Sequence, residues 1–239
     1  MTEALVRTGS FSTRAPALAR VESAVVDEHV PSWRGVTHEK AFALSPALGV
    51  LLVSTASGTT ARVAAVVFAV TMTCMLGAST LNHRARLGLR WEHRFRRADH
   101  VAILLFLGGT WTSVTLIVLE GAARAVLIAA VWGAVVLASM VLLAWLRVPG
   151  WLMAIIGLAV AWPPALVVLS HLGPAAGDAS VALFVAGGVA YTLGAVGYAF
   201  RRPNPHLAFG YHEVFHGLVL VGAACHYLTL AHFLLPLAP

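Results

Sequence analysis

Residues 61–83 read ARVAAVVFAVTMTCMLGASTLNH, and residues 84–97 continue RARLGLRWEHRFRR, so a long apolar run ends in an arginine-rich segment. A helix needs about 20 mostly apolar residues to cross a membrane, and the first run has that length. The arginines match the positive charge that membrane proteins keep in their cytoplasmic loops. This stretch therefore predicts a membrane-spanning helix whose last residue, His83, lies at the cytoplasmic side.

Similar apolar runs recur along the chain, which is 59% hydrophobic and only 11% charged. A soluble domain carries about 25% charged residues, so this composition indicates a protein embedded in lipid. Proline and glycine residues separate the runs, and Pro163 and Pro164 predict a kink inside the fifth one. We expect seven membrane-spanning helices, over residues 38–57, 61–83, 98–119, 122–146, 150–171, 179–200 and 211–236.

The basic residues orient these spans. With a cytoplasmic N-terminus, only Arg62 and Arg124 of the sixteen Lys and Arg residues fall outside the cell. This asymmetry favours an odd number of spans. We therefore predict an all-α membrane protein, a seven-transmembrane helix bundle with its N-terminus cytoplasmic and its C-terminus outside. Residues 1–33 are predicted to be a flexible cytoplasmic tail, and residues 34–239 the transmembrane domain.

The positive net charge of +6 does not indicate a nucleic-acid partner. The arginines lie in short loops between apolar runs, where the membrane accounts for them. We expect membrane lipids to be the surroundings and partners of this chain, and no nucleic acid. The oligomeric state stays open.

Ionisable residues within membrane spans are costly, so each is a functional candidate. His83 ends the second span, Asp99 begins the third, and His212 and His216 lie near the start of the seventh. In the predicted orientation all four lie at cytoplasmic helix ends. His212 and His216 are four residues apart, so their rings project from one helix face about 40° apart. This geometry can chelate zinc, with His83 as a third ligand and water in the fourth position.

The sequence from 212 to 216 also reads His-Glu-Val-Phe-His, the HExxH pattern of zinc proteases. In such a protease Glu213 would be the catalytic base. Alternatively, Glu213 faces the membrane interface near the helix start, where a carboxylate suits the helix dipole. Both interpretations stay open.

Two further polar residues have simpler interpretations. Asp99 could form an ordinary ion pair with Arg96 or Arg97. His226 lies about 15 Å along the helix from His216, at 1.5 Å per residue, and is too far away to share a metal ion with it. His226 is then a hydrogen-bonding core residue.

These residues resemble the hemolysin III proteins, bacterial members of the progestin and adipoQ receptor (PAQR) family. The resemblance covers residues from about 31 to 236 and includes Pro31-Ser-Trp-Arg-Gly-Val-Thr-His38, Ser79-Thr-Leu-Asn-His83, Arg97-Ala-Asp99 and Gly210-Tyr-His-Glu-Val-Phe-His216. It implies a seven-helix protein of the bacterial cytoplasmic membrane. It also implies Zn2+ held by His83, His212 and His216, with Asp99 near the zinc-bound water and the Ser79 hydroxyl close by.

Receptors of this family are similar to alkaline ceramidases, which implies zinc-dependent hydrolysis of a lipid amide such as a ceramide. Asp99 would hold or deprotonate the water, and Ser79 would donate to the oxyanion. Three alternatives remain: a non-enzymatic membrane-stress sensor or receptor with structural zinc, a pore or transporter, and an intramembrane metalloprotease using Glu213. Mid-membrane positions are mostly Ala, Val, Leu and Gly, which argues against an aligned polar pore.

Overall fold

The apolar runs form long helices that are packed side by side. The structure, a computed structural model, describes residues 33–84, 89–145 and 148–237. Within these ranges seven helices are long and apolar enough to cross a membrane, which confirms the predicted number. The chain is thus an all-α, multi-pass membrane protein. The helices are α2 (Val36–Thr55), α3 (Gly58–Arg84), α4 (Leu89–Val118), α5 (Gly121–Ala144), α6 (Gly150–Ala176), α7 (Asp178–Phe200) and α8 (Tyr211–Thr229).

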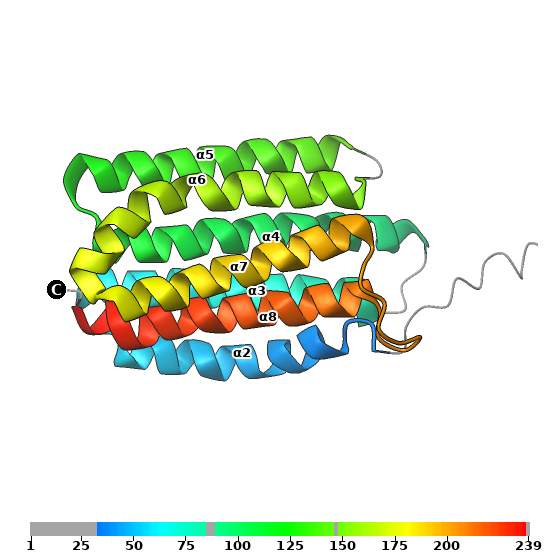
Figure 1. Cartoon of the computed structure of the whole chain (residues 1–239), viewed down its shortest axis with the longest axis horizontal. Helices are drawn as coiled ribbons and strands as arrows, with labels where there is room; N and C mark the ends of the chain where they lie inside the picture. Colours follow the sequence, from blue (N-terminus) through cyan, green and yellow to red (C-terminus); the bar gives the residue numbers. More distant parts are fainter. Residues whose placement is uncertain (1–32, 85–88, 146–147, 238–239) are drawn as a thin grey trace, which may run out of the picture.

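Each predicted span corresponds to one helix, although several bounds differ. The third helix, α4, begins at Leu89 rather than at residue 98. Its first turns are polar, so hydropathy excludes them, but an ion pair of 2.8 Å between Arg96 and Glu92 joins positions one turn apart. Helix α6 extends to Ala176, and Figure 1 shows it changing direction partway along, as Pro163 and Pro164 predict. Helix α8 continues as a π-helical segment (Leu230–Leu234) and a 3-10 turn (Leu235–Leu237).

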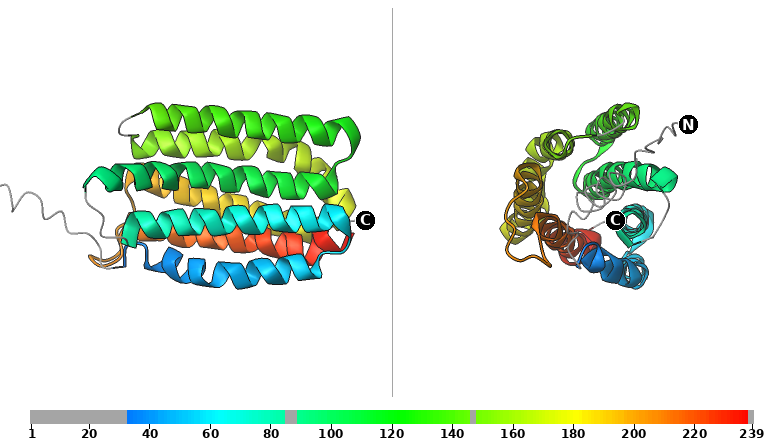
Figure 2. Two further views of the ribbon diagram at one scale, coloured as in Figure 1. Left: turned by 180° about the vertical axis from the view of Figure 1, so that it is seen from behind. Right: turned by 90° about the vertical axis from the view of Figure 1, so that its right-hand side faces the viewer.

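Most helices pack against their neighbours in sequence, and the first and last close the arrangement. Helix α4 contacts α3, α5 and α6, while α7 lies between α6 and α8. Helix α2 contacts both α3 and α8, and the end-on view in Figure 2 shows these three helices grouped together. Residues far apart in sequence on α3 and α8 can therefore meet.

Glycines allow close approach where the helices that carry polar residues cross. A Cβ atom at Gly109 on α4 would overlap the side chain of Thr71 on α3. A Cβ atom at Gly222 on α8 would overlap the ring of Tyr191 on α7. Helices in lipid associate through close packing of this kind, because lipid chains are as apolar as the side chains. These contacts bring α4 close to α3 and α8 close to α7.

One end of the bundle gathers the polar residues. Helix α3 ends there, α4 and α8 begin there, and α7 ends there, at the right in Figure 1. We call this the site end. Its cytoplasmic location follows from the distribution of basic residues and stays a prediction. The predicted flexible tail falls, except for Trp33, outside the described residues.

Candidate metal centre

His83, His212 and His216 meet at the site end. One ring nitrogen from each lies within 4.8 Å of the others, and Nε2 of His83 is 3.1 Å from Nε2 of His212. Two nitrogens bound to one tetrahedral zinc at about 2.0–2.1 Å are about 3.3 Å apart. The separation also suits a hydrogen bond between the two rings in the metal-free protein. These three residues could therefore hold a metal ion.

The burial of these histidines supports the same interpretation. His216 is only 2% exposed and His212 only 9%. Nδ1 of His216 has no hydrogen-bond partner among the residues that the structure describes. Buried polar atoms are normally paired, because leaving them unpaired costs free energy. A bound cation is one way to satisfy a cluster of ring nitrogens in a protein interior.

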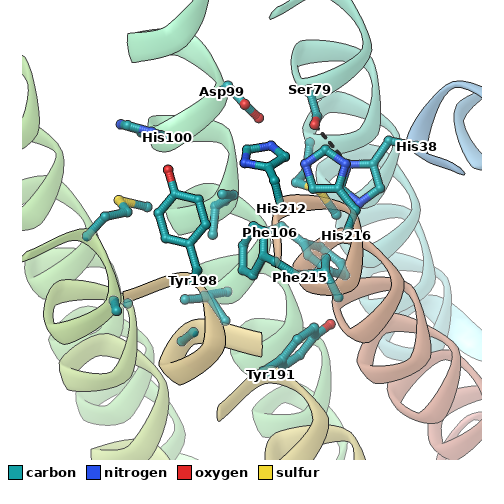
Figure 3. Close-up of a pocket in the computed structure, with 18 of the residues that line it drawn as sticks. His38, Ser79, Asp99, His100, Phe106, Tyr191, Tyr198, His212, Phe215 and His216 are labelled. Carbon is teal, nitrogen blue, oxygen red and sulfur yellow. Dashed lines mark hydrogen bonds between the residues drawn. The ribbon is translucent and has the colours of Figure 1, made fainter. Parts of the chain in front are cut away.

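Asp99 lies beside this cluster, on α4. Its Oδ2 atom is 3.5 Å from Nε2 of His83 and accepts a hydrogen bond of 2.9 Å from the side-chain amide of Asn82. The side chain is buried, at 6% exposed. Figure 3 shows the Asp99 carboxylate and the His212 ring among the side chains that line one pocket. The Asn82 amide therefore holds the carboxylate next to the point where the candidate ligand nitrogens meet.

The alternative ion pairs of Asp99 are not supported by the described contacts. The Arg96 guanidinium pairs with Glu92. The Arg97 guanidinium lies 3.5 Å from the carbonyl oxygen of Trp145. The described contacts of the Asp99 carboxylate are therefore with Asn82 and His83.

Ser79 reaches the cluster through His38. The Ser79 hydroxyl is 2.8 Å from Nδ1 of His38, a contact drawn in Figure 3. The His38 ring stacks on the His216 ring, with centroids 3.8 Å apart and planes 5° apart. His38 begins the first predicted span and ends the Pro31–His38 motif, but neither feature indicated a role for its side chain. The structure shows that His38 fixes both the hydroxyl and one of the candidate ligands.

The Glu213 carboxylate caps the start of α8. Its Oε2 atom accepts a hydrogen bond of 2.8 Å from the N–H of Gly210, at the start of α8. This agrees with the interpretation that the carboxylate suits the helix N-terminus. The side chain is 1% exposed, however, so it is buried and does not face the interface as expected. The hydrogen bond described for Glu213 is to the backbone, so the described hydrogen bonds do not support the HExxH protease interpretation.

A cavity of about 100 Å³ lies next to the histidines. Its polar wall includes Ser79, His83, Asp99, His212 and His216. Apolar side chains form the rest, including Ile103, Phe106, Met153, Leu158 and Val219. Tyr198 also lines it, with its ring 5.6 Å from that of His212. Tyr198 could not be identified from the sequence, because an aromatic residue near a helix end is common in membrane proteins.

His226 lies apart from this cluster. Its Nε2 atom is 3.1 Å from the carbonyl oxygen of Phe184, and the residue lines a second cavity of about 50 Å³. The described contacts therefore agree with its interpretation as a hydrogen-bonding core residue.

The chain is similar to known proteins over most of its length. A family model described as haemolysin-III related matches residues 26–227. A curated relative, Hemolysin-3 of Bacillus cereus, is 29% identical over 217 residues, which cover 85% of this chain and 91% of the relative. The three histidines, Asp99 and Ser79 lie within the matched range. The chain belongs to the haemolysin-III family.

Proposed function

We propose that this protein is a zinc-dependent hydrolase that cleaves an amide bond in a membrane lipid such as a ceramide. The observation that carries the proposal is the convergence of His83, His212 and His216 beside Asp99 and a largely apolar cavity. Three protein ligands with an open fourth position are typical of catalytic zinc sites, whereas structural sites use four. When bound, zinc would lower the pKa of a water molecule and polarise the substrate carbonyl.

Asp99 is the general base of this proposal. A base must lie within reach of the proton that it removes, directly or through one water molecule. The Oδ2 atom is 3.5 Å from a ring nitrogen of His83, so the carboxylate borders the place where the ligand nitrogens converge. The Asn82 amide donates to the same oxygen and holds the carboxylate in orientation.

Ser79 is the proposed donor to the developing oxyanion. Its hydroxyl can donate to the substrate only if His38 donates to it, because a hydroxyl has one hydrogen. His38 would then carry its proton on Nδ1, which lies 2.8 Å from the Ser79 oxygen. His38 thereby sets the direction of the Ser79 O–H bond.

The cavity walls suggest the class of substrate. Apolar side chains from α4, α6 and α8 border the polar groups, and an acyl chain matches such a surface. The site end is proposed to face the cytoplasm, so the substrate would enter from the adjacent lipid leaflet. The chain would then act in a bacterial cytoplasmic membrane.

The test combines metal analysis with ceramide hydrolysis by the purified protein. The wild type is expected to hold one zinc and to release fatty acid, whereas His212→Ala loses both. His171→Ala is the matched control, because His171 is exposed on α6 and away from the cavity. A wild type that holds zinc but turns over no lipid amide would refute the catalytic proposal.

One observation favours a second candidate, a receptor or membrane-stress sensor with structural zinc. The cluster joins α3 to α8, so a metal ion there would link two helices that are remote in sequence. This alternative predicts that zinc removal lowers the unfolding temperature, while the protein has no turnover to lose. The pore and protease alternatives have no comparable support.

A further inference from the structure

A second group of polar side chains lies around the smaller cavity, deeper in the bundle than the histidine cluster. Thr110 of α4, Tyr191 of α7 and His226 of α8 line it among apolar residues. Thr110 Oγ1, the Tyr191 hydroxyl and His226 Nδ1 are all buried and have no hydrogen-bond partner in the described part of the chain. Such atoms are costly in a protein interior. Three residues with such atoms line this one cavity, so a hydrogen-bonding group held among them would pair atoms that the described contacts leave unpaired.

The hydrogen bond of His226 determines what Nδ1 can do. Nε2 lies 3.1 Å from the Phe184 carbonyl oxygen, and a carbonyl only accepts, so Nε2 carries the ring proton. Nδ1 of the neutral ring is then an acceptor. The Tyr191 hydroxyl can donate as well as accept, and the two rings are 5.2 Å apart in an edge-to-face arrangement. A ligand hydroxyl could donate to Nδ1 and accept from Tyr191, whereas a carbonyl would leave Nδ1 unpaired.

The His226 ring is held firmly in place. It stacks on Phe184, with centroids 4.2 Å apart. The ring edge with Cδ2 and Nε2 lies against Gly187, where an added Cβ would come within 2.6 Å of Cδ2. The edge with Nδ1 is therefore the one turned away from Gly187. A rigid acceptor of this kind is suited to selecting a ligand group by its position.

The two cavities adjoin. Tyr191 lines both of them, as do Leu107, Leu158 and Ala161. His216 and His226 are about 15 Å apart along α8. Carbon–carbon bonds are about 1.5 Å long, so an extended zigzag chain covers this distance in roughly twelve bonds. A lipid whose carbonyl lies at the histidine cluster would bring the middle of a long acyl chain to the second cavity.

We propose that Tyr191, His226 and Thr110 form a subsite for a hydroxyl group near the middle of an acyl chain. The placement of the carbonyl end rests on the proposed hydrolase function. The subsite would add a substrate class to that function, namely lipids with a mid-chain hydroxylated acyl group. A cavity of this size could also hold water, and the experiment distinguishes these two occupants.

The experiment measures binding of octadecanoic acid and of its analogue hydroxylated about twelve bonds from the carboxyl carbon. Each competes with radiolabelled octadecanoic acid for the purified, zinc-loaded protein in detergent. The hydroxylated acid is expected to bind the wild type at least about tenfold more tightly, equivalent to about 1.4 kcal/mol. Tyr191→Phe keeps the ring and removes the hydroxyl, so the ratio of affinities should fall close to one. Thr110→Val is a second, similarly sized variant and should lower the ratio.

Tyr227→Phe is the matched control. The Tyr227 hydroxyl donates to the Leu48 carbonyl oxygen at 3.0 Å and lines neither cavity. This variant should keep the wild-type ratio. If the wild type binds both acids equally or neither acid, the cavity holds water only and the proposal is overturned. A ratio that survives both Tyr191→Phe and Thr110→Val overturns it as well.

The binding assay does not depend on turnover. Selection of the hydroxylated acid without hydrolysis of any lipid amide would support the subsite and reject the hydrolase. Hydrolysis without such selection would support the hydrolase and reject the subsite. The two proposals can therefore fail separately.

Discussion

Replacing Gly35 with alanine should weaken zinc binding, although Gly35 is not a candidate ligand. Gly35 precedes α2 with a φ angle of 75°, and an added Cβ would lie 2.6 Å from the Cβ atom of His83. A left-handed conformation costs a non-glycine residue roughly 1–2 kcal/mol. Overpacking against a fixed neighbour costs about 1–3 kcal/mol more. The variant therefore carries about 2–5 kcal/mol of strain, and movement of His83 relieves part of it.

Any strain that is relieved when His83 moves away opposes the metal-bound arrangement. Relief of about 1.4–2.8 kcal/mol would raise the dissociation constant for zinc about tenfold to a hundredfold. The dissociation constant is measured by competition with a fluorescent chelator in detergent. Thermal unfolding of the same samples, with and without chelator, shows whether the fold itself is weakened.

Gly217→Ala is the matched control for this substitution. Gly217 adjoins His216 on α8, and an added Cβ there meets no atom within 4 Å. Because the added Cβ contacts no other group, the affinity for zinc should be unchanged. Alanine at a compatible helical position stabilises the folded protein by about 0.4–1 kcal/mol. If Gly35→Ala binds zinc as tightly as Gly217→Ala, the start of α2 does not position His83 and the reasoning is refuted.

Three further substitutions test individual residues. Asp99→Asn should retain zinc and lose about 10²–10⁴-fold in kcat for ceramide, because the base is gone; loss of zinc would instead make Asp99 a ligand. Asn82→Leu removes the donor to the Asp99 carboxylate and should destabilise the protein by about 1–3 kcal/mol in thermal unfolding. An unchanged unfolding temperature would contradict that role. Glu213→Gln keeps an acceptor for the Gly210 N–H, so zinc content and hydrolysis should stay at wild-type levels. Retained zinc with abolished turnover would revive the protease interpretation.

The number and order of the membrane helices could be predicted because a helix that crosses lipid must be apolar over about 20 residues, and the sequence shows such runs directly. Helix ends were less predictable, since the polar start of α4 extends the helix to Leu89 by local hydrogen bonding and charge pairing. The burial of Glu213 was also missed. A helix cap depends on the conformation of the local backbone. Residues 204–210 fold back against the start of α8, where the Asn204 side chain accepts a hydrogen bond from the Tyr211 N–H.

The meeting of His83, His212 and His216 could be predicted for two reasons. The topology places all three at the same side of the membrane, and the four-residue spacing places His212 and His216 on one face of their helix. The roles of His38 and Asn82 could not. Their contacts depend on the rotation of α2 and α3 about their own axes, and the lipid-facing and interior sides of these helices are both largely apolar. Hydropathy therefore does not specify which side of a helix turns inward.

The separation of His83 and His212 by 129 residues also affects how the protein is made. At 5–20 residues per second, a ribosome needs roughly 6–26 s to synthesise the chain between them. During that interval α3 is already complete, while α8, with two of the three ring nitrogens, does not yet exist. A cation that requires all three nitrogens can be captured only after the last helix enters the bilayer. Metal occupancy would therefore report that synthesis and insertion of the whole bundle are finished.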